Sequence, residues 1–123
     1  MPARPTVLIV EDDPATHRLY ERALQPEYQV LAASTEADVT ALLTAGTLVH
    51  AVVLEPGPVG SWGWVLLSEL RRHADFESVP LILCTAQDEK RRGLELGATE
   101  YLVKPVLPAD LLATVRRVTR PLP

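Results

Sequence analysis

Short apolar runs alternate with longer amphipathic stretches along the chain. The clearest run, Val7 to Val10, has four aliphatic residues in succession, and later runs have a similar character. Continuous apolar runs of this length are typical of strands that are covered on both faces. The pattern predicts five strands, over residues 7–10, 28–32, 50–54, 81–85 and 100–103.

The stretches between these runs have apolar residues at helical spacing. Pro14 suits the first turn of a helix, which we expect to reach about Leu24 with Leu19, Tyr20 and Ala23 facing inward. Ser34 is the expected N-cap of the second helix, and Gly46 its C-terminal stop. Three more helices are predicted: one through 65–70 that closes around 71–74, one over about 89–96 capped by Gly97, and one over 109–118.

Five strand–helix units with uncharged strands indicate an α/β fold, a doubly wound parallel sheet with helices on both faces. In such sheets the functional groups lie just beyond the carboxyl ends of the strands. Polar residues follow four of the five predicted strands at that edge: Glu11-Asp12-Asp13, Glu55, Thr85-Ala86 and Lys104-Pro105.

These strand ends suggest a site for a cation and an oxyanion. Carboxylates from the first and third strands would lie roughly 5 to 10 Å apart and repel each other, so the site should bind a cation or hold a proton. Mg²⁺ suits such oxygen ligands, and a Thr hydroxyl with a Lys ammonium would bind an oxyanion. The alternative is a set of solvated strand ends that only keeps this edge polar.

Composition narrows the class of protein. The 123 residues suit one domain, and twelve basic against sixteen acidic residues give a net charge of 12 − 16 = −4. A hydrophobic content of 47% excludes a disordered tail, and one cysteine excludes a disulfide scaffold. Cys84 lies inside an apolar run, where a buried and inert thiol is expected. With no secretory or membrane-spanning pattern, we expect a cytoplasmic location and no membrane contact, and the acidic balance argues against nucleic-acid binding.

Several segments together resemble the receiver domain of two-component response regulators, over essentially the whole chain. The most specific is the run from Gly97 to Pro105, followed by the acidic cluster after the first strand. The segments that carry the resemblance are Val10-Glu11-Asp12-Asp13-Pro14, the third strand into Glu55, Gly60, Gly63-Trp64, Leu83-Cys84-Thr85-Ala86 and Gly97-Ala98-Thr99-Glu100-Tyr101-Leu102-Val103-Lys104-Pro105.

The resemblance implies a flavodoxin-like (βα)5 fold with a five-stranded parallel sheet of order 2-1-3-4-5. It places Glu55 at the phospho-acceptor position. It also implies a set of roles at the carboxyl edge: Glu11, Asp12, Glu55 and the carbonyl of Gly57 as ligands of Mg²⁺, with Asp13 flanking; Thr85 and Lys104 as phosphoryl contacts; and Tyr101 as the switch aromatic.

Glu55 departs from the family, which has Asp at that position. Phosphoryl transfer depends on positioning, and a misplacement of about 1 Å can cost about 100-fold in rate. We therefore expect a degenerate receiver that acts independently of phosphorylation, with the Glu55 carboxylate opposite Lys104 and Thr85. The alternatives are a conventional Mg²⁺-dependent phosphoryl-accepting switch and, more weakly, a small metal-dependent hydrolase.

Two further departures concern the surface. The segment 87–96 is about three residues shorter than the usual family spacing, close to one helical turn, which puts the inherited switch at Tyr101 in question. Trp62 replaces a commonly acidic residue before Gly63. An exposed Trp there would serve as a partner contact, and the alternative is an indole folded over its own loop.

The expected organisation is a single receiver-like domain over 1–123, with an ordered core of about 6–119 and a tail of 120–123. We expect a signalling protein rather than an enzyme, acting through protein contacts: a histidine kinase, an output protein, another receiver or a second copy of itself. Weak binding of Mg²⁺ is expected, with no cofactor required for folding. Pairing of Glu55 with Lys104 would instead close the metal site.

Overall fold

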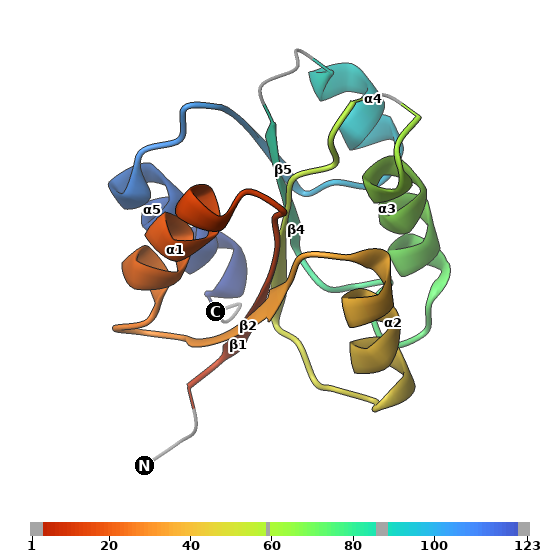
Figure 1. Ribbon diagram of the computed structural model, residues 1–123, viewed down its shortest axis with the longest axis horizontal. Helices are drawn as coiled ribbons and strands as arrows, with labels where there is room; N and C mark the ends of the chain where they lie inside the picture. Colours follow the sequence, from red (N-terminus) through yellow and green to blue (C-terminus); the bar gives the residue numbers. More distant parts are fainter. Residues whose placement is uncertain (1–3, 59, 86–88, 121–123) are drawn as a thin grey trace.

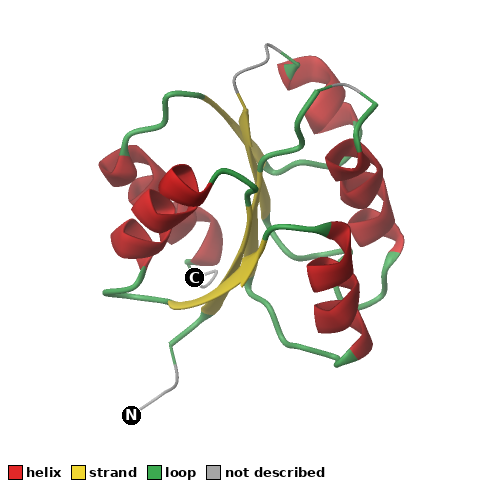
Figure 2. Cartoon of the chain, in the orientation of Figure 1, coloured by secondary structure: helices red, strands yellow, loops and turns green. Residues whose placement is uncertain are grey.

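The structure is a computed structural model that describes residues 4–58, 60–85 and 89–120. A parallel sheet has the strand order β2-β1-β3-β4-β5, and helices cover both of its faces (Figures 1 and 2). The predicted fold class and strand order are confirmed. In chain order the elements are β1 (Thr6–Val10), α1 (Pro14–Leu24), β2 (Gln29–Ala33), α2 (Glu36–Thr44), β3 (Ala51–Leu54), α3 (Trp62–Arg72), β4 (Leu81–Thr85), α4 (Lys90–Glu95), β5 (Glu100–Val103) and α5 (Pro108–Thr119).

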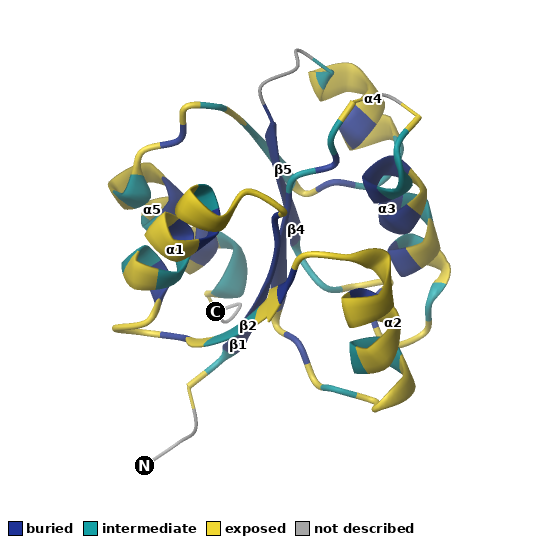
Figure 3. Cartoon of the chain, in the orientation of Figure 1, coloured by how far each residue is buried: buried dark blue, intermediate teal, exposed yellow. Residues whose placement is uncertain are grey.

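The sheet separates two apolar cores. Helices α1 and α5 lie on one face, and α2, α3 and α4 lie on the other (Figure 1). Because side chains alternate along a strand, Val7 and Ile9 of β1 enter the core beneath α1 and α5, whereas Leu8 and Val10 enter the opposite core. Strands β1, β3 and β4 are buried along their whole length, while the outer surfaces of the helices are exposed (Figure 3). This double burial explains the continuous apolar runs.

Helix α1 has the predicted bounds but a different buried face. His17, Tyr20 and Leu24 are buried and form one stripe at helical spacing, whereas Leu19 is 45% exposed. The expectation that Leu19 faces inward is therefore wrong. The first member of the stripe is the polar residue His17, one turn before Tyr20. A pattern based on aliphatic residues alone therefore does not reveal where the stripe begins.

Helix α2 begins one residue later than predicted. Thr35, not Ser34, is its N-cap: the Thr35 hydroxyl accepts the N–H of Asp38 at 3.2 Å, and the Asp38 carboxylate accepts the N–H of Thr35 at 3.2 Å. This reciprocal pair is a capping box in which Asp stands in place of the usual Glu. Gly46 has a φ of 67° just beyond the helix, as expected of its C-terminal stop.

Some predictions fall outside the described residues. Val59, Ala86 to Asp88 and residues 121–123 of the expected tail belong to that part of the chain. Within the described ranges, the helices are too short or too polar for any of them to span a bilayer.

Candidate functional site

Two glutamates lie at the carboxyl edge of the sheet, each directly after a central strand. Glu11 follows β1 and Glu55 follows β3, and these strands pair in parallel so that Val10 lies opposite Leu54. The Glu55 N–H donates to the carbonyl of Val10 at 3.0 Å, which continues the ladder one residue past the strand. Glu11 is only 3% exposed. The structure thus brings two carboxylates together at one edge, one of them buried.

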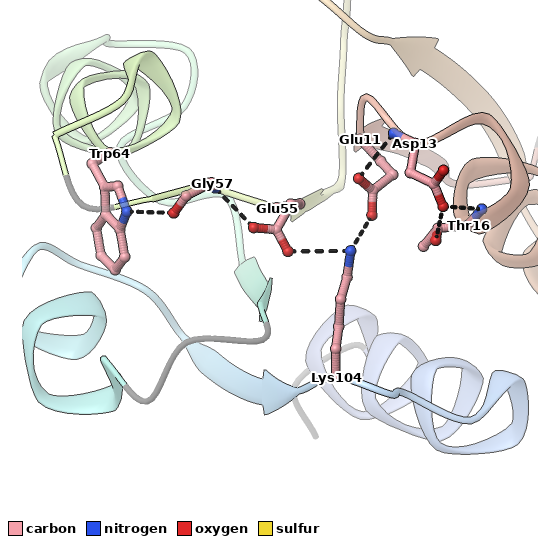
Figure 4. Close-up of polar contacts among 7 residues, drawn as sticks. All are labelled: Glu11, Asp13, Thr16, Glu55, Gly57, Trp64 and Lys104. Carbon is pink, nitrogen blue, oxygen red and sulfur yellow. Dashed lines mark hydrogen bonds and ion pairs between the residues drawn. The ribbon is translucent and has the colours of Figure 1, made fainter.

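Lys104 lies between these two carboxylates. It follows β5, and its backbone N–H donates to the carbonyl of Thr85 at 2.9 Å. Its Nζ donates to Glu11 Oε1 at 2.5 Å and lies 3.2 Å from Glu55 Oε2 (Figure 4). One ammonium group therefore satisfies two carboxylates from two other strands, which links β1, β3 and β5 at this edge.

The pKa of Lys104 reflects this environment. Partial burial acts to lower the pKa of the ammonium group, but the hydrogen bonds and negative charges of Glu11 and Glu55 outweigh it. As a result, the pKa of Lys104 lies above its usual value of 10.5. The lysine is therefore charged at neutral pH, as its ion pairs with Glu11 and Glu55 require.

The loop after Glu55 holds the second oxygen of that carboxylate. The Gly57 N–H donates to Glu55 Oε1 at 2.8 Å, and Gly57 has a φ of 74°, a conformation that favours glycine. The indole of Trp64 donates from Nε1 to the Gly57 carbonyl at 3.0 Å (Figure 4). The Ser61 hydroxyl donates to the Pro56 carbonyl at 3.0 Å. Both oxygens of Glu55 are therefore engaged, one by Lys104 and one by this loop.

Trp64 is a site residue that we did not predict from sequence. It is 5% exposed and lies in the first turns of α3, where the sequence alone predicts a core residue rather than a site residue. Its contact with Gly57 depends on a loop that curls back over the helix start. The single sequence signal for this contact is the glycine that precedes Trp64. Gly63 lets the start of α3 lie close to the loop, because a Cβ there would be 2.5 Å from the Pro56 carbonyl oxygen.

The two aspartates after Glu11 differ in role. Asp12 is exposed, whereas Asp13 is the N-cap of α1. The Asp13 carboxylate accepts two hydrogen bonds from Thr16, one from the backbone N–H at 3.1 Å and one from the side-chain hydroxyl at 2.5 Å. These bonds hold the pKa of Asp13 below its usual 3.8. Asp13, which we predicted only to flank the acidic pair, therefore acts as the N-cap of α1.

A small cavity of about 90 Å³ opens beside the two glutamates. Hard oxygen donors and an indole share this space, although within the described residues no three Asp, Glu, His or Cys side chains converge as a metal cage. The structure thus brings the four predicted metal ligands and Trp62 together around one cavity: it is lined by Val10, Glu11, Asp12, Glu55, Pro56, Gly57, Pro58, Ser61 and Trp62.

The other predicted residues lie around this cluster. Thr85 ends β4 and is fully buried. Tyr101 of β5 is half-buried against the core, and its hydroxyl accepts the N–H of Glu89 at 2.8 Å. Trp62 is half-buried, in contact with the same core cluster as well as the cavity. Trp62 is therefore partly covered rather than fully exposed, which favours an indole packed over its own loop, and its role as a partner contact stays a prediction.

Comparisons with known proteins agree with this geometry. A family model described as the response regulator receiver domain matches residues 7–116. The transcriptional activator protein IrlR of Burkholderia pseudomallei is 38% identical over 118 residues, which cover 93% of this chain and 50% of that protein. The chain therefore spans about half the length of this relative.

Two solved structures show the same fold over nearly all of both chains. The chemotaxis response regulator CheY4 of Vibrio cholerae has a TM-score of 0.83 at 26% identity, and the match covers 94% of this chain and 99% of that one. The receiver domain of the sensor histidine kinase PA1611 from Pseudomonas aeruginosa has a TM-score of 0.79 at 27% identity, over 95% and 98%, and holds a magnesium ion in its active site cleft. The chain therefore belongs to the response regulator receiver domain family of two-component signalling.

Proposed function

We propose that this chain is a receiver that signals through protein contacts without accepting a phosphoryl group. The resemblance to receivers puts Glu55 at the phospho-acceptor position, and the position of Lys104 supports the proposal. Its ammonium group contacts Glu11 at 2.5 Å and Glu55 at 3.2 Å. The cation expected to contact a phosphoryl group is thus already neutralised by two carboxylates of the chain.

Both oxygens of Glu55 are already engaged, so an attack on a phosphoryl group would have to use the remaining lone pair of an oxygen that is held in place. Oε2 is paired with Lys104 and Oε1 accepts the Gly57 N–H at 2.8 Å. Glutamate also places its carboxylate one methylene further from the backbone than aspartate does. Since transfer depends on in-line positioning, these constraints act against an acyl phosphate at Glu55.

The same residues would hold Mg²⁺ weakly. Glu11, Asp12, Glu55 and the Gly57 carbonyl line one cavity, and a second lone pair on that carbonyl stays available beside the Trp64 bond. A bound Mg²⁺ would supply positive charge at this edge. It would have to compete with Lys104 for the carboxylates, so we expect an affinity that improves when the Lys104 charge is removed.

The function is that of a signalling domain rather than a catalyst. The ordered unit that we propose covers about residues 6–119, matching the sheet and its five helices. Its partners would be a histidine kinase, an output protein, another receiver or a second copy of itself. A constant pattern of charges at the site would let such contacts form without a phosphorylation step.

The test is incubation with acetyl phosphate and Mg²⁺, followed by intact-mass measurement with and without hydroxylamine, which cleaves acyl phosphates. We expect no labile phosphoryl group on the wild-type chain and a measurable one on Glu55→Asp, with Glu55→Gln as the control that has no nucleophile. A stoichiometric, hydroxylamine-labile phosphoryl group on wild-type Glu55 would contradict the proposal and support a conventional switch. An unlabelled Glu55→Asp variant would show that the surrounding contacts, rather than the extra methylene, prevent transfer.

A further inference from the structure

Helix α4 is held at its start by a side chain from β5. The N-cap residue Glu89 makes no capping bond with its own side chain, and its backbone N–H donates instead to the Tyr101 hydroxyl at 2.8 Å. Unsatisfied N–H groups at a helix start normally need a side chain or water. Tyr101 therefore takes part in capping a helix to which it does not belong.

The middle of α4 lies unusually close to the sheet. A Cβ built on Gly93 would be 2.4 Å from Leu83 Cδ1 and 3.3 Å from Tyr101 Cδ2. Leu83 is completely buried in β4, so its side chain has little space into which to move. The absence of a side chain at Gly93 thus lets the helix rest directly on Leu83 and on the Tyr101 ring.

The turn after α4 is bound by α3. The Arg71 Nε donates to the Gly97 carbonyl at 2.7 Å, and its Nη1 donates to the carbonyls of Phe76 at 2.9 Å and Val79 at 2.7 Å. One guanidinium group therefore joins the end of α4 to the connection between α3 and β4. Arg71 is also partly buried, which acts to lower its pKa, and these carbonyls compensate the buried charge.

From these three contacts we infer that Tyr101 is a positioning residue that braces α4, and that the α4–β5 face keeps one conformation whatever the state of Glu55. The Tyr101 ring supports Gly93 and its hydroxyl caps the helix start. A rotation of Tyr101 out of the core would remove both supports together. The inference goes beyond the proposed function, because it stands on contacts that involve neither Glu55 nor Lys104.

Amide hydrogen exchange measured by NMR on the full chain tests the brace. In Tyr101→Phe the ring stays and the hydroxyl is lost, so we expect the amides of Glu89, Gly93 and Leu96 to exchange about fivefold faster. Amides of the central strands should keep their rates, which separates local opening from a general loss of stability. Equal rates in α4 of the variant and the wild type would overturn the inference.

Gly93→Ala is a second test, for which we expect the opposite change in amide exchange from the one that this substitution usually causes in a helix. In an exposed helix this change slows opening, because alanine favours the helix. Here we expect at least tenfold faster exchange across α4, since the new methyl group would collide with Leu83. Arg91→Ala, at an exposed position of the same helix, is the matched control and should change α4 exchange less than twofold. Slower exchange in Gly93→Ala would contradict the inference.

Glu55→Gln separates this inference from the proposed function. We expect its α4 amides to exchange at wild-type rates, because the brace is local to Tyr101, Gly93 and Arg71. A change in α4 as large as that of Tyr101→Phe would overturn the inference and leave the phosphorylation result untouched. Conversely, a phosphoryl group on wild-type Glu55 with unchanged α4 exchange would defeat the proposed function and support the brace.

Discussion

At the scale of single residues, the buried carboxylate of Glu11 depends on one cation. Glu11 has a side chain that is 2% exposed, and Lys104 Nζ is its charged partner at 2.5 Å. Taking a carboxylate out of water costs several kcal/mol unless it is paired and hydrogen-bonded. The ion pair therefore matters to stability chiefly because losing one partner leaves the other uncompensated.

We predict that Lys104→Met lowers the free energy of unfolding by about 3 kcal/mol, because the carboxylate of Glu11 is left buried and unpaired. Urea unfolding followed by circular dichroism measures this loss. Adding Glu11→Gln to Lys104→Met should restore part of the stability, since the buried charge is then gone. A loss below about 0.5 kcal/mol in the single variant would mean that the pair is solvated and contributes little.

The residues of the site were predictable to different degrees. Glu11 and Glu55 could be placed at one edge because each follows an apolar run, and parallel strands end on the same side. The double contact of Lys104 could not be predicted in detail, because it depends on side-chain rotamers across three strands. Trp64 was missed for a similar reason: its bond to Gly57 exists only once the loop has folded back.

At the scale of elements, helix α2 shows how a boundary is decided by geometry rather than by residue type. Ser34 and Thr35 are both good N-caps, and sequence alone does not separate them. The Thr35 hydroxyl accepts the Asp38 N–H, whereas Ser34 only donates its backbone N–H to the Asp38 carboxylate at 2.9 Å. The helix consequently starts after Thr35.

Thr35→Ala should lower the free energy of unfolding by about 1 kcal/mol, the usual cost of removing an N-cap hydroxyl. Ser34→Ala is the matched control and should cost much less, because the backbone bond from Ser34 to Asp38 survives the change. Thermal unfolding of both variants, compared at the wild-type melting temperature, provides the measurement. A larger loss in Ser34→Ala than in Thr35→Ala would place the cap one residue earlier.

The strands were the most predictable elements. Double burial makes β1, β3 and β4 apolar at all positions except Thr6 and Thr85 at two of their ends, so their runs are visible without any periodicity. Strand β2 is an edge strand, exposed at Gln29 and Ala32, and its bounds were displaced by one residue. Leu19 shows the corresponding limit for helices, because an apolar residue next to the buried stripe cannot be told from one within it.

At the scale of the whole molecule, the core contains two weakly acidic side chains, Cys84 and Tyr20, that burial keeps protonated. Burial raises the pKa of the Cys84 thiol to about 12, and the nearby glutamates add to the effect. Burial also raises the pKa of the Tyr20 hydroxyl well above its usual 10, and the neighbouring Cys84, Glu11 and Glu55 add to this rise. In the unfolded chain both groups would release their protons at their ordinary pKa values.

We therefore predict that stability falls as pH rises above about 9. Above that pH the unfolded chain loses the Cys84 proton, whereas the folded chain keeps it until its pKa of about 12, so the folded state binds more protons. Each such group costs up to about 1.4 kcal/mol per pH unit. Urea unfolding between pH 8 and 11 measures the slope, and Cys84→Ala should make it shallower. A free energy that stays flat over this range would contradict the burial of these acids.

The contact of Lys104 with Glu11 and Glu55 can be tested by measuring the pKa of the Lys104 ammonium group. The chain has only two lysines, Lys90 and Lys104, so carbon-13 labelling at lysine Cε gives two signals, with the exposed Lys90 as an internal reference. We predict a pKa above 10.5 for Lys104, reduced in Glu11→Gln and less so in Glu55→Gln. A pKa for Lys104 at or below 10.5, unchanged by Glu11→Gln, would show that the two glutamates do not hold the ammonium group.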